Sequence, residues 1–251
     1  MSGAHTQLLA PYGRLHAIPG ANKIAATAAW VLLVTFTPRA AFWAFAAHAL
    51  CVVGIIAYAR VPVAHVARRL TIELPFVAFA CALPIIGSGN RIGIFGVSLS
   101  ERGLWAMWAI LAKGTLGVAA SIVLAATTPV SELLRGLERL RVPTLFVGIS
   151  GFMVRYSDVL LDELRRMRIA RLSRGHDPRW LWQSRAIGAT AGTLFVRSFE
   201  RGERVHIAML SRGYDGRMPT FRAEQTMRST ALVFVPVAFA LVVVVVARVL
   251  A

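Results

Sequence analysis

The sequence predicts an all-α integral membrane protein with about five transmembrane helices and a helical cytosolic region. The composition is the first observation: 57% of the 251 residues are hydrophobic and only 16% are charged, whereas charged residues make up roughly a quarter of a soluble domain. The second is the placement of the charges. Residues 128–229 contain 18 of the 28 Lys and Arg and 10 of the 12 Asp and Glu. The remaining sequence therefore consists mostly of apolar runs with cations at their ends, as in membrane helices.

The first two predicted spans form a hairpin. Residues 24–38 are uncharged but number only 15, which is about 22 Å of helix. This span crosses the membrane only if Lys23 and Arg39 extend their charged ends to its two surfaces. Residues 40–59 form a full uncharged run of 20, which favours a tight link around Pro38 and Arg39.

Three more apolar runs complete the set of predicted spans. Residues 74–86 contain two prolines, which membrane helices tolerate because neighbouring groups satisfy the freed backbone. Residues 104–128 and 230–247 are the fourth and fifth spans. Between the spans we expect a basic loop at 60–73 and a Gly- and Ser-rich loop at 87–103.

The basic residues predict one orientation for all five spans. By the positive-inside rule, the loop with Arg68 and Arg69 lies in the cytosol, and so does the charge-dense block 128–229. Four spans before that block then place the N-terminus in the cytosol as well. The sequence therefore predicts transmembrane helices in 1–127, a cytosolic helical region at 128–229 and a last transmembrane helix in 230–251.

The cytosolic region contains three features of its own. Residues 142–154 are apolar, but they number only 13 and Arg155 follows, so we expect an interfacial or packed segment rather than a span. Gly188 and Gly192 have a spacing that permits close helix contact and that is also common by chance. One apolar stripe with helical spacing is expected to form core: Leu160, Leu161, Leu164, Met167 and Leu172.

One phrase occurs twice in the cytosolic region. Residues 170–175 are Ala-Arg-Leu-Ser-Arg-Gly and residues 208–213 are Ala-Met-Leu-Ser-Arg-Gly, and each phrase ends a run with helical spacing. Because Gly favours the end of a helix, we expect Arg174 and Arg212 in the last turn of a helix. For a single copy, an Arg that complements the helix dipole is a sufficient explanation. Two copies favour a function in which each guanidinium binds carboxylates or carbonyls of one of two similar partner subunits.

The sequence offers little for catalysis or metal binding. It has no Gly-x-x-x-x-Gly-Lys-Ser/Thr loop, no His spacing typical of a metal site and no Ser/His/Asp arrangement. Glu73 and Glu101 stand at the ends of predicted spans, which leaves no relay of acids through the membrane. Cys51 and Cys81 are expected as small core residues, and His48 as a packed or hydrogen-bonded one. We therefore predict neither an enzyme nor a site for a cofactor or metal.

Several segments around the two phrases match the pattern of one family. They are Thr128–Pro129, Ser131–Leu134, Leu140–Pro143, Arg155–Tyr156 and Leu161–Glu163. Together with the phrases at 172–175 and 208–216, they resemble the transmembrane T component of energy-coupling factor (ECF) transporters. Residues 194–216 are similar to the cobalt branch of that family, CbiQ. At the N-terminus, residues 18–23 resemble the family's Asp-Pro-Arg-x-Lys opening but lack its Asp and Arg.

The resemblance implies a subunit of an ATP-driven importer in the bacterial plasma membrane. Its partners would be two cytosolic ATPase subunits and a membrane-embedded S component that binds the substrate. Cobalt is the implied substrate, although T components for nickel, biotin and thiamine precursors share the core signature. Ser173 and Ser211 replace the family's usual Ala, and both are small enough to preserve packing in a groove. The implied ATPase-docking residues are Ser173, Arg174, Gly175, Ser211, Arg212 and Gly213.

Two other classes of function remain as alternatives. A membrane-embedded enzyme acting on lipid head groups would need a catalytic constellation, which the sequence does not present. A nucleic-acid binder would be consistent with the net charge of +16, and its affinity would fall steeply with salt. The acids mixed among the basic residues of 128–229 make that alternative weaker.

Overall fold

The computed structural model describes residues 18–87, 91–94, 97–175, 184–216 and 228–250. These residues form two compact units, which we describe separately. The described residues up to Leu137 and after Ala223 make up the bundle unit. Those between Glu138 and Arg222 make up the two-helix unit.

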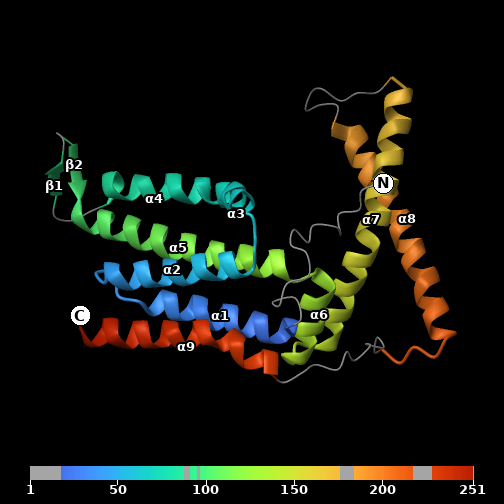
Figure 1. The fold of residues 1–251 in the computed structure, drawn as a ribbon. Coiled ribbons are helices and arrows are strands. Elements are labelled where there is room, and N and C mark those ends of the chain that lie inside the picture. Colours follow the sequence, from blue (N-terminus) through green and yellow to red (C-terminus); the bar gives the residue numbers. More distant parts are fainter. Residues whose placement is uncertain (1–17, 88–90, 95–96, 176–183, 217–227, 251) are drawn as a thin grey trace. The chain divides into compact units, whose positions relative to one another are not determined.

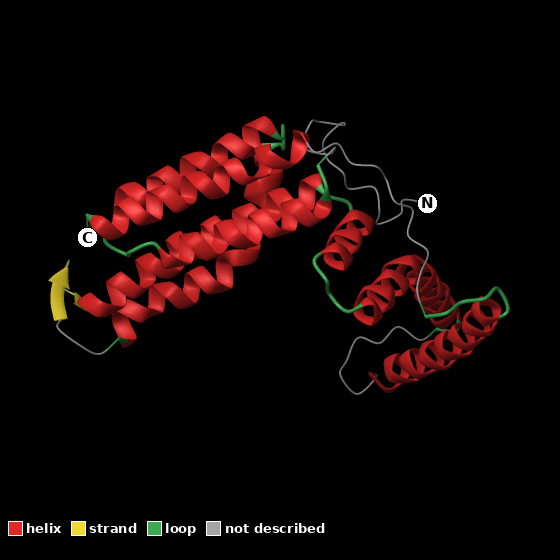
Figure 2. Cartoon of the chain, turned by 90° about the horizontal axis from the view of Figure 1, so that it is seen from below, coloured by secondary structure: helices red, strands yellow, loops and turns green. Residues whose placement is uncertain are grey.

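Five long helices of the bundle unit lie lengthwise beside one another (Figure 1). Each of the five predicted apolar runs contains one of these helices, so their helical structure is confirmed. Figure 2 shows the same helices from below. The helices are α1 (Gly20–Phe36), α2 (Phe42–Tyr58), α4 (Leu74–Ile86), α5 (Glu101–Thr127) and α9 (Arg228–Val249).

The segment predicted as a basic loop, 60–73, is largely helical, so that prediction is wrong. Pro62 precedes α3 (Val63–Leu70), and a 3-10 turn, Thr71–Glu73, leads directly into α4. Pro at a helix start costs no intrahelical hydrogen bond, which explains why the helix begins there. The Arg pair of α3 interrupts the apolar pattern in the sequence, and the interruption hid a helical stretch that runs from Val63 to Ile86.

Glu73 lies inside this helical stretch, whereas the sequence predicted it at the end of a span. Its side chain is buried between helices, and Thr115 of α5 donates a hydrogen bond of 3.2 Å to its Oε1. Gly114 provides the room, because a Cβ at that position would lie 2.9 Å from the same oxygen. Burial of a carboxylate in the bundle therefore depends on a hydroxyl donor and a missing side chain on α5.

The predicted loop at 87–103 also contains regular structure. Strands β1 (Arg91–Ile94) and β2 (Val97–Ser100) form an antiparallel pair in which Arg91 lies opposite Ser100. Helix α5 begins at Glu101, and the Ser100 side chain caps it by accepting a hydrogen bond of 3.3 Å from the Gly103 N–H. Apolar residues alternate with Arg and Gly in β1 and with Ser in β2, and this alternation is the sequence signal that the Gly and Ser content concealed.

Three helical stretches among the described residues are long and apolar enough to cross a membrane. These are Val63–Ile86, Glu101–Thr127 and Thr144–Ser173, judged by length and composition. Helices α1 and α2 and the Val233–Val249 part of α9 are apolar but shorter. Large apolar side chains cover the outside of the bundle: Leu50 is 72% exposed, Phe76 67% and Val249 80%. Such a surface is stable in lipid and not in water.

The bundle core lies between α1, α2, α5 and α9. Small residues on α2 and α9, Ala44 and Ala247 among them, let these two helices approach closely. His48 is fully buried, and its Nε2 lies 3.3 Å from Oγ1 of Thr37, so the prediction of a hydrogen-bonded core histidine is confirmed. Cys81 is exposed, contrary to its predicted place in the core. The main cluster is Trp30, Val34, Phe45, Val52, Leu116, Ala119 and Ala240.

Three cations of the bundle satisfy carbonyls at helix ends. Lys113 Nζ donates to the Thr35 oxygen at 2.7 Å, and Arg248 donates to the Phe36 oxygen at 3.3 Å, both at the end of α1. At the opposite end of the bundle, Lys23 Nζ donates to the Thr127 oxygen at 3.3 Å. Cations at these positions complement the negative ends of the helix dipoles. The charges that interrupt the apolar runs therefore tie neighbouring helices together.

A backbone contact joins α6 (Val130–Arg139) to the start of α1. A Cβ on Gly136 would lie 2.7 Å from the Ala21 nitrogen, and a Cβ on Gly20 would lie 2.5 Å from the Glu132 oxygen. Both distances are too short for any real side chain. The two glycines therefore allow a contact between helix backbones within the bundle unit.

The two-helix unit consists mainly of α7 (Thr144–Ser173) and α8 (Ser184–Leu210). We expected residues 142–154 to form a separate interfacial or packed segment rather than a span. All but the first two instead belong to the 30-residue helix α7, which by length and composition is one of the candidate membrane spans. The apolar stripe predicted as core is not buried: the structure describes every residue of α7 and none is buried, with Leu161 43% exposed. A Cβ at Gly188 or Gly192 would meet nothing within 4 Å, so the close contact inferred there is absent too.

Candidate functional site

The two Ser-Arg-Gly phrases form the same backbone structure at two helix ends. Gly175 has φ +76° and donates its N–H to the Leu172 oxygen at 2.9 Å; Gly213 has φ +81° and donates to the Leu210 oxygen at 2.9 Å. In the second copy, Tyr214 N–H also donates to the Met209 oxygen at 3.1 Å, which completes a Schellman motif. The positive φ values explain why Gly stands at both positions.

The two arginines occupy equivalent positions, one residue before each Gly. Arg174 is the capping residue of α7, and Arg212 lies two positions after Leu210, the last residue of α8, so both stand just beyond the last turn in which we expected them. Arg174 N–H donates to the Arg171 oxygen at 3.2 Å, and Arg212 N–H donates to the Met209 oxygen at 3.0 Å. The backbone of each Arg is thus fixed by its own helix while the side chain is free to point away.

The serines of the phrase turn their hydroxyls inward. Ser173 Oγ donates to the Ala170 oxygen at 3.0 Å, and Ser211 Oγ donates to the Ile207 oxygen at 3.0 Å. Each hydroxyl is therefore satisfied within its own helix and needs no partner. This geometry explains how Ser can replace the Ala of the ECF pattern at both positions.

The guanidinium groups of Arg174 and Arg212 are available for binding. Both residues are exposed, and neither side chain has a hydrogen bond or ion pair within the part of the chain that the structure describes. A guanidinium offers five N–H donors in a planar fork, which suits carboxylates and carbonyl groups of a partner. Each copy of the phrase therefore presents, at the end of its helix, one guanidinium that has no partner among the described residues.

The guanidinium groups of Arg174 and Arg212 lie at opposite ends of the two-helix unit. Helix α8 runs beside α7 in the opposite direction, so their C-terminal ends point away from each other (Figure 1). Glu163 and Arg197 mark the place where the helices touch. Eleven residues separate Glu163 from Arg174, and fifteen separate Arg197 from Arg212. At about 1.5 Å per residue, the arginines can stand nearly 40 Å apart.

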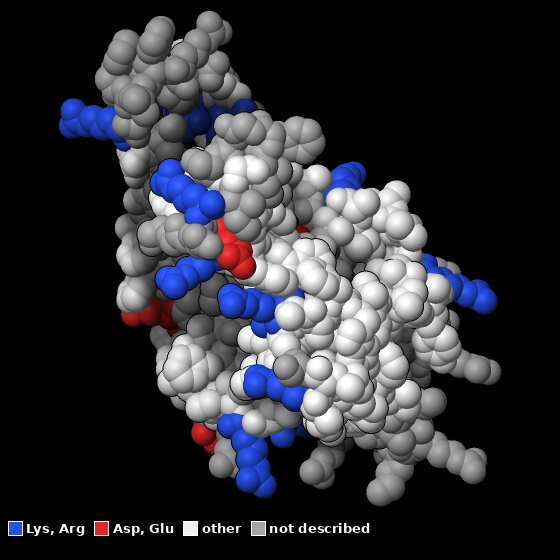
Figure 3. Space-filling view, turned by 90° about the vertical axis from the view of Figure 1, so that its left-hand side faces the viewer, with Lys and Arg blue, Asp and Glu red and all other residues white. Residues whose placement is uncertain are grey.

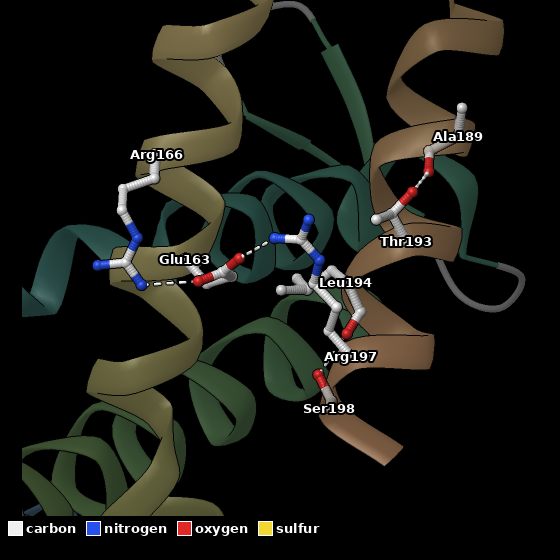
Figure 4. Close-up of polar contacts among 7 residues, drawn as sticks. All are labelled: Glu163, Arg166, Ala189, Thr193, Leu194, Arg197 and Ser198. Atoms are coloured by element: carbon white, nitrogen blue, oxygen red, sulfur yellow. Dashed lines mark hydrogen bonds and ion pairs between the residues drawn. The ribbon is translucent and has the colours of Figure 1, made fainter. Parts of the chain in front are cut away.

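One acidic side chain joins the two helices. Glu163 of α7 lies between Arg166 of its own helix and Arg197 of α8 and is bonded to both (Figure 4). Arg166 Nη2 lies 2.6 Å from Glu163 Oε2, and Arg197 Nη1 donates to Oε1 of the same carboxylate. The sequence showed that Arg166 can reach Glu163, because the two are three residues apart on a helix. It gave no indication of Arg197, which is 34 positions away.

The face of the protein drawn in Figure 3 is mostly uncharged. Lys and Arg stand there at separate positions among uncharged residues and do not form one continuous basic surface. Among the described residues, the structure contains no group of three or more His, Cys, Asp or Glu that could hold a metal ion.

The comparisons with known proteins give the family. Residues 14–221 match the family described as cobalt transport protein, CbiQ. This range covers more than half of the chain and includes both Ser-Arg-Gly helix ends. The chain belongs to the CbiQ family. The resemblance inferred from the sequence is therefore confirmed, and so is the class of all-α membrane protein with several spans.

Relatives in and beyond the CbiQ family cover different parts of the chain. The cobalt transport protein CbiQ of Rhodobacter capsulatus is 28% identical over 223 residues, 87% of each chain. The putative fused cobalt transport protein CbiMQ of Methanocorpusculum labreanum is 30% identical over 204 residues, 75% of this chain. The chain spans only 34% of the length of that fused relative. The ECF transporter transmembrane protein EcfT of Limosilactobacillus fermentum is 27% identical over 161 residues, 57% of this chain and 60% of EcfT.

Proposed function

We propose that this CbiQ-family chain is the transmembrane T component of an ECF-type importer. In this function it hydrolyses nothing and binds no cofactor, and it transmits the movement of two cytosolic ATPase subunits to a substrate-binding S component in the membrane. The observation that supports the proposal most directly is the pair of identical helix ends. Each presents an Arg whose side chain has no partner among the residues that the structure describes, and the two stand at opposite ends of an antiparallel helix pair.

The separation of the two arginines favours two partners over one. A groove that binds a helix end is about as wide as one helix, roughly 10 Å, whereas the two ends can stand nearly 40 Å apart. Each end therefore docks separately, and equal local structure at both ends suits two similar subunits. We propose that Ser173, Arg174 and Gly175 dock on one ATPase subunit and Ser211, Arg212 and Gly213 on the other. As part of the same proposal, residues 128–229 lie in the cytosol, together with the N-terminus.

Apolar side chains on the two-helix unit support contact with a membrane partner. Leu145, Phe146 and Met153 near the start of α7 are 68%, 62% and 66% exposed, and Phe195 and Phe199 on α8 are 71% and 61% exposed. A stripe of this kind needs a lipid or protein surface to cover it. We propose that the S component covers part of it, which also accounts for the unburied stripe of α7.

We propose cobalt as the transported ion, because the matching family and the Rhodobacter capsulatus relative carry that name. The substrate would bind the S component, and this chain would couple its uptake to ATP. Nickel, biotin and thiamine precursors remain alternatives, which EcfT-type relatives keep open. Uptake of labelled cobalt against the other substrates by the assembled complex distinguishes them.

The docking proposal is tested by reversing the charge of each Arg in the full chain. Arg174→Glu and Arg212→Glu are compared with Arg168→Glu and Arg204→Glu, which make the same change at exposed positions on the same two helices. The measurement is the amount of ATPase subunit that co-purifies with the tagged chain from membranes in mild detergent. Losing a desolvated Arg pair costs about 2 kcal/mol or more, so each motif reversal should weaken binding at least about 25-fold.

Three results would count against the proposal. The wild-type chain could purify without an ATPase, or the motif reversals could bind as well as the control reversals. The purified chain could also turn over a lipid substrate by itself, which would favour the membrane-enzyme alternative.

A further inference from the structure

We propose that Glu163 is a positioning residue that holds α7 and α8 at one crossing angle, so that Arg174 and Arg212 move together. The inference rests on the proposed function, because it concerns how the two docking arginines are held. The carboxylate bridges the helices through Arg197, and Arg166 fixes its orientation from the same helix. Glu163 lies eleven positions before Arg174 and is not part of either docking motif.

The carboxylate of Glu163 is shielded, unlike that of its neighbour Asp162. Its side chain is 13% exposed, whereas the arginines that contact it are 64% and 58% exposed. The adjacent pair of Asp162 and Arg165 is open to solvent, at 59% and 70%, with its atoms 3.2 Å apart. Solvent and salt weaken an exposed pair strongly and a shielded one much less. Glu163 therefore contributes more to helix orientation than its neighbour does.

Packing alone does not fix the helix crossing. No residue of α7 is buried, so the two helices share no buried core that would define their angle. The hydroxyls of Thr193 and Ser198, on the part of α8 beside Arg197, donate to carbonyls of their own helix (Figure 4). A two-helix contact of this kind relies on its specific polar bond more than a packed bundle does.

The position of the bridge makes it a pivot. Arg174 and Arg212 lie about 17 Å and 22 Å of helix beyond it, in opposite directions, at about 1.5 Å per residue. A rotation of about 10° around Glu163 therefore moves the two arginines by roughly 3 Å and 4 Å. Without the bridge, each helix end could follow its own ATPase subunit, and the movement would no longer reach the other end.

The first experiment measures the angle directly in the full chain, in lipid nanodiscs and without any ATPase. Cys51→Ala and Cys81→Ala remove the native thiols, and spin labels are attached after Arg168→Cys and Arg204→Cys, which lie between the bridge and the two helix ends. Pulsed electron paramagnetic resonance gives the distribution of distances between the labels. We expect Glu163→Gln and Arg197→Gln each to broaden this distance distribution. Combining the two substitutions should broaden it no further, and Asp162→Asn should leave it unchanged.

The second experiment measures coupling in the reconstituted importer, as substrate taken up per ATP hydrolysed. We expect Glu163→Gln and Arg197→Gln to lower this ratio about fivefold or more while co-purified ATPase stays close to wild type, because the docking motifs are intact. Arg197→Lys keeps the charge and should restore part of the ratio, and Asp162→Asn should have no effect. This pattern separates a pivot from a general loss of folding.

The inference is wrong if Glu163→Gln and Asp162→Asn give the same distance distribution, or if Arg197→Gln leaves the coupling ratio at the wild-type value. Failure of the proposed function has another signature: the wild-type chain then binds no ATPase, although the label experiment still reports whether Glu163 sets the angle.

Discussion

Replacing Gly136 by alanine should loosen the contact between α6 and the start of α1. The new Cβ would lie 2.7 Å from the Ala21 nitrogen and 2.8 Å from the Gly20 carbonyl carbon. Both are backbone atoms of a helix, so neither can move without shifting α1 as a whole. Overpacking of this kind costs about 1–3 kcal/mol, while Ala gains up to about 1 kcal/mol over Gly in a helix. With the full gain subtracted, the net expectation is a loss of up to about 2 kcal/mol.

Thermal unfolding of the detergent-solubilised chain tests this number. For a chain of this size, 1 kcal/mol corresponds to about 2–4 °C, so Gly136→Ala should lower Tm by up to about 8 °C. The control is Gly54→Ala in α2, where a Cβ would meet nothing within 4 Å and Tm should stay the same or rise. A Gly136→Ala protein as stable as Gly54→Ala would refute the argument that the two helices are in direct backbone contact.

Two further predictions concern a docking motif and the bundle core. Gly213→Ala places a side chain at φ +81°, which costs about 1–2 kcal/mol. It should lower co-purified ATPase about 5- to 30-fold, whereas Gly202→Ala within α8 should not; equal binding would show that the left-handed turn is dispensable. His48→Ala leaves a cavity and removes a partner of Thr37, so it should destabilise the bundle by about 2–4 kcal/mol. Exposed His206→Ala is the control, and equal Tm values would contradict the prediction.

The spans were predictable because lipid imposes a simple rule on the sequence. A helix in the membrane needs a long run without charges, and each of the five predicted runs contains a helix. The same rule concealed α3, whose Arg68 and Arg69 look like a cytosolic loop when charge is the only criterion. It also misplaced Glu73, since the end of an apolar run was taken as the end of the helix.

The helix ends were predictable for a different reason. Gly175 and Gly213 adopt left-handed conformations that other residues avoid, so their positions in the sequence already mark where α7 and α8 stop. The sequence contains no comparable signal for the relative direction of the two helices, or for which side chains pair between them. The bond between Glu163 and Arg197 joins residues 34 positions apart, and the sequence offers several other Arg residues in the same block. Which of them reaches Glu163 depends on how the two helices cross.

If the chain docks two ATPase subunits as proposed, the antiparallel arrangement of α7 and α8 explains how it reaches both of them. Two parallel helices would bring both arginines to the same end, where only one partner fits. Two antiparallel helices with the same terminal motif are related by an approximate twofold axis near their crossing, and a pair of similar ATPase subunits has a twofold axis of its own. Repeating the motif on consecutive helices therefore gives one chain a matched surface for each subunit. The unequal arms, eleven residues to Arg174 and fifteen to Arg212, break this symmetry, so the same rotation moves the α8 end farther than the α7 end.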